Sequence, residues 1–66
     1  MSDMHALEIV RTKTVGGEVY PTVLRLRVAG GWVYEFIAYN QKYGERRDFL
    51  IAASVSTSFV PDVRDV

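Results

Sequence analysis

Apolar and polar side chains alternate along most of this chain, and glycines interrupt the alternation. Gly16-Gly17, Gly30-Gly31 and Gly44 separate segments that are rich in Val, Ile, Tyr, Phe and Thr. Alternation bounded by glycine turns is typical of β-hairpins. The pattern therefore predicts four strands, at about residues 6–14, 19–28, 32–39 and 46–57.

The fourth of these segments requires a choice, because Asp48 would also suit the first position of a short helix. The odd positions from Phe49 to Phe59 are apolar at five of six sites, whereas the even positions from Leu50 to Val60 are half serine. A period of two indicates a strand rather than a helix.

Turn length determines which residues of neighbouring strands lie opposite each other, so the register can be predicted. We expect a two-residue turn at Gly16-Gly17, a three-residue loop over residues 29–31 and a four-residue loop over residues 41–44. The first turn gives the pairs Leu7–Leu26, Glu8–Arg25, Ile9–Leu24 and Val10–Val23. The two loops give Leu24–Phe36, Arg25–Glu35, Leu26–Tyr34, Val28–Trp32, Phe36–Phe49, Tyr34–Ile51 and Trp32–Ala53.

These registers predict an all-β fold, a four-stranded antiparallel meander in the order 1-2-3-4. Its apolar face is expected to carry Leu7, Ile9, Leu24, Leu26, Val28, Trp32, Tyr34, Phe36, Phe49 and Ile51. The aromatic residues of this set would suit a ligand groove, but their aliphatic neighbours favour a core. The opposite face is expected to carry a Glu8–Arg25–Glu35 charge ladder. Pro21 lies inside an inner strand, where it cannot donate to the ladder, so we expect a bulge or a break there.

A single meander has an apolar face that must be covered. Residues 58–66 would cover it as a fifth strand that closes a small barrel, or two copies would cover it as a homodimer. The second face also carries apolar residues, which favours the homodimer. The candidate dimer surface consists of Val10, Val23, Val33, Ile37 and Leu50.

Length and composition indicate one small domain over residues 1–66, with residues 1–5, including His5, and 61–66 as loose termini. Eight basic residues balance eight acidic ones, so whole-chain attraction to nucleic acid or to an anionic membrane is not indicated. The chain has no cysteine and a lone histidine, so no disulfide, His/Cys metal site or cofactor is expected. No apolar run approaches the length of a membrane span, and the first residues do not resemble a secretory signal. We therefore expect a cytoplasmic protein.

Residues that would carry catalysis are not arranged for it. Ser54, Ser56 and Ser58 lie on a strand face without a neighbouring histidine, and the glycine pairs are not followed by a phosphate-binding helix. We expect a non-enzymatic protein-binding module, such as an adaptor, assembly factor or inhibitor, that acts through a sheet surface or edge as a homodimer. Small inhibitors from phages and mobile elements fit this description.

Basic and aromatic residues gather at one end of the predicted meander. The candidate contact residues there are Arg11, Lys13, Lys42, Tyr43, Arg46 and Arg47. Such a cluster would bind a phosphate backbone and stack bases, so nucleic-acid binding is the alternative function. Glu18, Glu45 and Asp48 share this end and reduce its positive charge, and an acidic protein partner would suit it equally.

Overall fold

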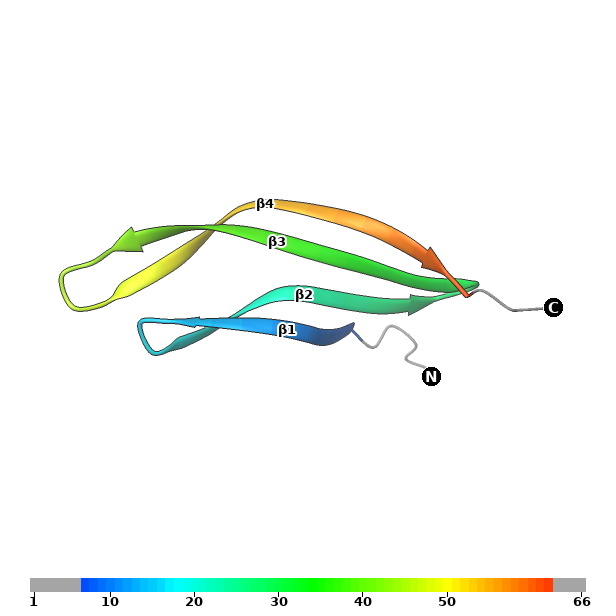
Figure 1. Cartoon of the computed structure of the whole chain (residues 1–66), viewed down its shortest axis with the longest axis horizontal. Helices are drawn as coiled ribbons and strands as arrows, with labels where there is room; N and C mark the ends of the chain where they lie inside the picture. The colour runs from blue at the N-terminus through cyan, green and yellow to red at the C-terminus, as the bar shows by residue number, and fades with distance from the viewer. Residues whose placement is uncertain (1–6, 63–66) are drawn as a thin grey trace.

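The computed structural model describes residues 7–62. They form four strands, β1 (Leu7–Val15), β2 (Glu18–Val28), β3 (Gly31–Tyr43) and β4 (Asp48–Pro61), in one antiparallel sheet of order β1-β2-β3-β4 (Figure 1). The predicted meander is confirmed. The segment after Asp48, for which a short helix was the alternative, is a strand as predicted. The sheet is open and does not close into a barrel: residues 58–61, expected to begin a fifth strand, continue β4 instead.

The β1–β2 hairpin has the predicted turn and most of the predicted register. Gly16 and Gly17 have φ values of 61° and 83°, and two successive positive φ angles are what a two-residue hairpin turn of right-handed twist requires. The pairs Leu7–Leu26, Glu8–Arg25 and Ile9–Leu24 are confirmed.

Beyond Ile9 the register of this hairpin shifts twice. Arg11, not Val10, lies opposite Val23, and the register returns where Thr12 lies opposite Pro21. The expected irregularity beside Pro21 is therefore confirmed, and the predicted Val10–Val23 pair is wrong because a bulge inserts Val10 without a partner.

The predicted β2–β3 register is wrong by one residue. Gly31 begins β3 opposite Val28, so the loop contains only Ala29 and Gly30, whose φ is 85°. A shift of one residue moves every side chain of a strand to the other face. Trp32, Tyr34 and Phe36 consequently lie on the side opposite Leu24 and Leu26, and Glu35 lies opposite Leu24 rather than Arg25.

The reason for Gly31 is a close approach and not a turn. A Cβ atom at this position would overlap the backbone of β4 at the Val60 carbonyl and the Pro61 Cα. Glycine is thus required here because the β4 backbone lies against it. Of the two glycines, Gly30 belongs to the turn and Gly31 is the first residue of β3.

The predicted β3–β4 loop is also displaced. The loop spans residues 44–47, and the Gly44 N–H donates to the Arg47 carbonyl at 3.1 Å. β3 therefore continues to Tyr43, which lies opposite Asp48, and Phe36 lies opposite Ser56 rather than Phe49. A further bulge places Ala53 out of register, since Ala52 lies opposite Tyr39 and Ser54 opposite Ala38.

Cross-strand pairing divides the sheet into two faces. One face, called the Leu24 face, carries Leu7, Ile9, Leu24, Leu26, Val33, Glu35, Ile37, Val55, Thr57 and Phe59. The other, called the Trp32 face, carries Glu8, Val23, Arg25, Arg27, Trp32, Tyr34, Phe36, Ser56, Ser58 and Val60. The predicted single apolar face and the predicted Glu8–Arg25–Glu35 ladder are therefore both wrong, apart from the Glu8–Arg25 pair.

The two hairpins are joined by backbone pairing over only half of their length. β2 and β3 pair from Val28–Gly31 to Val23–Phe36, and beyond that point these two strands separate (Figure 1). Side chains connect them there instead. The Tyr20 and Tyr39 rings meet edge to face with centroids 5.5 Å apart, and the Tyr39 hydroxyl donates to the Pro21 carbonyl at 2.6 Å.

The buried core of the described residues is small and lies beside this contact. Leu24 and Leu50 are the two buried hydrophobic side chains, with 8% and 7% of their surface exposed. The Leu50 N–H donates to the Tyr20 hydroxyl at 3.2 Å, which ties β4 to β2 across the gap between the hairpins.

The molecule is long and thin, with extents of 55 × 27 × 17 Å. The described strands form a single sheet layer, with exposed apolar side chains on both faces. The described residues include no helix that is long and apolar enough to cross a membrane.

Candidate partner-binding surface

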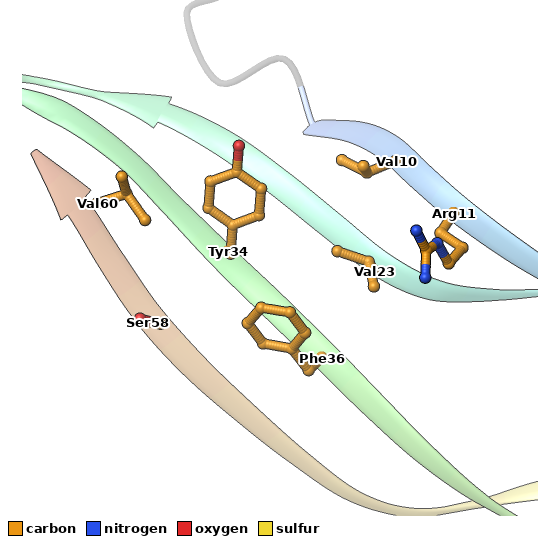
Figure 2. A pocket seen from close by; sticks show the side chains of 7 residues that line it. All are labelled: Val10, Arg11, Val23, Tyr34, Phe36, Ser58 and Val60. Carbon is orange, nitrogen blue, oxygen red and sulfur yellow. The ribbon is translucent and has the colours of Figure 1, made fainter. Parts of the chain in front are cut away.

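A groove crosses the Trp32 face and receives side chains from all four strands (Figure 2). Its volume is about 390 Å³, and its lining residues are Val10, Arg11, Val23, Tyr34, Phe36, Ser58 and Val60. The β1 bulge contributes to it directly, because two consecutive side chains, Val10 and Arg11, reach the same side of the sheet. The lining is mostly apolar, with a guanidinium group at one end.

Three of the groove residues are exposed hydrophobic side chains. Val10, Phe36 and Val60 keep 50%, 43% and 45% of their surface exposed. The aromatic alternation that we interpreted as core thus forms part of an open surface, with the Tyr34 and Phe36 rings stacked at 6.3 Å. An exposed apolar strip with a polar rim is typical of a protein-interaction site.

Arg25 organises the rim of this groove. Its Nε donates to Glu8 Oε1 at 2.7 Å, its Nη1 lies 3.5 Å from the Tyr34 hydroxyl, and its Cζ lies 4.0 Å from the Trp32 ring centroid. The hydrogen bonds with Tyr34 and then Glu8 raise the pKa of Arg25 above its usual range, against a smaller effect of desolvation. The guanidinium group therefore stays charged and fixed over the indole ring.

Arg27 connects the same ring to the end of β4. Its Cζ lies 5.1 Å from the Trp32 centroid, and its two terminal nitrogens donate to Asp62 at 3.0 and 2.6 Å. The hydrogen bonds from Arg27 lower the pKa of the Asp62 carboxyl group, although desolvation opposes this shift. Of the expected C-terminal tail, Pro61 and Asp62 are held against the sheet, whereas residues 63–66, like residues 1–5 with His5, lie outside the described residues.

Five of the six candidate basic and aromatic residues lie at or near the hairpin tips, namely Lys13, Lys42, Tyr43, Arg46 and Arg47. The two tips are joined by an ion pair in which Arg47 Nη1 donates to Glu18 Oε2 at 2.9 Å. Tyr43 is 79% exposed, and Lys13, Lys42 and Arg46 are exposed as well. Arg11 is separate from the tips, because it lines the groove. The tips are also tightly fitted, since a Cβ atom on Gly16 would overlap the Asp48 carbonyl.

The five candidate dimer residues do not share one surface. Val10 and Val23 line the groove on the Trp32 face, whereas Val33 and Ile37 lie on the Leu24 face. Leu50 is buried between the hairpins. Of the five, only Val10 and Val23 line the groove. The incorrect β2–β3 register explains why Val33 and Ile37 were grouped with them.

Sequence reasoning missed the Arg25–Trp32–Arg27 cluster and the outer edge of β4. The cluster had a signal, since Arg25 and Arg27 alternate with leucines, but the predicted register placed Trp32 on the other face. Within the part of the chain that the structure describes, no group of three or more acidic, histidine or cysteine side chains is placed to hold a metal ion.

Comparisons with protein-family models, with curated proteins and with solved structures found no match to this chain.

Proposed function

We propose that this chain is a non-enzymatic protein-binding module, of the adaptor, assembly-factor or inhibitor kind, that acts as a homodimer through its sheet. The observation that supports this most directly is the exposure of apolar side chains on both faces. Leu7 and Ile9 on the Leu24 face are 54% and 59% exposed, and Val10 and Val60 beside Trp32 are 50% and 45% exposed. Surfaces of this kind are stabilised when a partner covers them.

The groove on the Trp32 face is the proposed site for the protein partner. An apolar side chain of the partner would fill the space beside Phe36 and Val60, and a carboxylate at its margin would meet Arg11. Arg25 is already engaged by Glu8 and Tyr34, so it contributes a fixed wall rather than a free charge. Buried aromatic and arginine side chains commonly supply most of the affinity at such interfaces.

Affinity capture from a cell extract tests the groove with a matched pair of variants. Phe36→Asp places a charge in the groove, whereas Phe49→Asp places it on a similarly exposed ring near the tips. We expect the wild-type chain and Phe49→Asp to retain the same proteins and Phe36→Asp to lose them, with circular dichroism confirming that all three fold. Equal recovery by all three chains would exclude the groove, and no specific recovery by any of them would contradict a protein-binding role.

A second candidate function is nucleic-acid binding at the hairpin tips, favoured by one observation. Tyr43 is 79% exposed beside Lys42, which leaves an aromatic ring available for stacking next to an exposed cation. Fluorescence anisotropy with labelled single-stranded and duplex probes should then show affinity that falls steeply with salt and is lost in Lys42→Glu. Absence of binding at low salt would remove this candidate.

A further inference from the structure

The two outer edges of the sheet differ in how they are protected. β1 carries Glu8, Arg11 and Lys13 along its length, and charged side chains on an edge strand oppose pairing with another chain. The segment of β4 from Ile51 to Val60 contains no charged residue at all. A long uncharged edge strand offers unpaired backbone groups to a further strand.

Part of the β4 edge is already covered, and this limits where a further strand can pair. The Leu50 N–H donates to the Tyr20 hydroxyl, and the Gly16 turn lies against the Asp48 carbonyl. The bulge at Ala53 interrupts the edge next, and Pro61 has no N–H to donate at the other end. The uninterrupted edge therefore runs over residues 54–60, and Thr57 lies at its centre.

The phase of the β3–β4 ladder shows which residues in this segment point outward. The Asp62 N–H donates to the Gly30 carbonyl at 2.9 Å, so the next pair, Gly31–Pro61, makes no ladder hydrogen bonds. Bonded and non-bonded pairs alternate in an antiparallel ladder. Val55, Thr57 and Phe59 therefore direct their backbone N–H and C=O groups away from β3, toward the open edge.

We propose that this edge pairs with the same edge of a second copy, antiparallel, about a two-fold axis at Thr57. This inference rests on the proposed homodimer and gives its location. Each Thr57 would exchange both backbone hydrogen bonds with Thr57 of the partner subunit, and Val55 would do so with Phe59 of the partner subunit. The two four-stranded sheets would then form one continuous eight-stranded sheet.

The side chains of the segment fit this arrangement. On the Leu24 face, Val55 and Phe59 are 56% and 53% exposed. The two-fold axis would place Val55 of one copy beside Phe59 of the partner subunit. Pairs of an aromatic and a β-branched residue, and Thr–Thr pairs, are favourable neighbours across strands. On the Trp32 face the junction joins Ser56 to Ser58 of the partner subunit, without any like-charge contact.

Exposed apolar side chains at this edge also favour a second copy. Val60, at the end of the segment, keeps 45% of its surface exposed, in addition to Val55 and Phe59. Pairing with a second copy would remove part of this apolar surface from water, which favours association.

Opposite charges at the two-fold axis give a direct test. Thr57→Lys and Thr57→Glu each place two like charges opposite one another in a homodimer, so we expect each to weaken dimerisation at least about tenfold. An equimolar mixture of the two variants should restore a dimer, because an ammonium group and a carboxylate then face each other across the axis.

Thr14→Lys, on the charged β1 edge, is the matched control and should dimerise like the wild-type chain. Size-exclusion chromatography with light scattering over a dilution series measures all five samples.

Amide hydrogen exchange provides a second readout on the wild-type chain. The N–H groups of Val55, Thr57 and Phe59 should exchange faster on dilution, whereas that of Ser56, bonded within the β3–β4 ladder, should not change. A wild-type dimer that persists in both Thr57 variants would overturn this interface and leave the proposed homodimer in place. A wild-type chain that is monomeric at every concentration would overturn the inference, and the Phe36 capture experiment would then decide the protein-binding role separately.

Discussion

The two halves of this sheet are held together in different ways. In the half near residues 29–30, all four strands are joined by backbone ladders, and the side chains above them form an open cluster of Arg25, Trp32 and Arg27. In the half near the hairpin tips, the β2–β3 ladder has ended, and Tyr20, Tyr39 and Leu50 join the hairpins through side chains.

This difference explains where burial is found. A continuous ladder connects strands without help from side chains, so both faces above it remain available for a partner. Where the ladder is absent, packing must replace it: Leu50 is buried there, and the other buried leucine, Leu24, lies one pair from the end of the ladder. Stability should therefore depend mainly on the tip half, and binding mainly on the half with the complete ladder.

The largest expected effect is the loss of a buried leucine in the tip half. Leu50→Ala removes one of two buried apolar side chains and should lower the free energy of unfolding by about 2–5 kcal/mol, enough to unfold much of so small a domain. Urea denaturation followed by circular dichroism measures it. Ile51→Ala, at a neighbouring residue that is 48% exposed, should cost much less. Equal costs would show that the tip half has no special role.

A smaller effect is expected from the tyrosine that bridges the hairpins. Tyr39→Phe removes the hydrogen bond to the Pro21 carbonyl, keeps the ring contact with Tyr20, and should cost about 1 kcal/mol. Tyr43→Phe removes a hydroxyl from a ring that is 79% exposed and should leave the denaturation midpoint unchanged. If both variants unfold at the wild-type midpoint, the bridge does not contribute to stability.

The smallest effect concerns the ion pair of the other half. The Arg27 hydrogen bonds hold the pKa of Asp62 below its unfolded value, so the carboxylate favours the folded state above the unfolded pKa. This contribution disappears as the pH falls through the folded pKa. Asp62→Asn should therefore lose slightly more stability at neutral pH than in acid, where the two chains converge. Thermal unfolding across the acidic range measures this, and a constant difference at all pH values would contradict it.

The sequence was sufficient for the features that depend on period and turn residues. The number and order of strands, the Gly16-Gly17 turn and the first pairs of the β1–β2 hairpin were all predicted. Pro21 correctly indicated an irregularity, because a missing N–H has the same consequence in any strand.

The two later registers were not predictable from local pattern, for physical reasons that lie far along the chain. Gly31 looks like a turn residue, but its lack of a side chain is required by β4, about thirty residues later. Residues 41–43 were predicted to lie in a loop, but they continue β3 because its partner strand is long enough to pair with them. A register error of one residue assigns every side chain of a strand to the wrong face. Residues of two different surfaces were therefore grouped as one candidate dimer surface, and the groove was not predicted.

The connection of each strand only to its neighbours in sequence has a consequence for how this chain folds. Every ladder closes a loop of a few residues, so little chain entropy is lost before the first cross-strand bonds form. Chains dominated by such local contacts fold faster than sandwiches and barrels of similar length. Each hairpin can form its cross-strand hydrogen bonds outward from its own turn. The contact between Tyr20 and Tyr39 forms only after both hairpins are present.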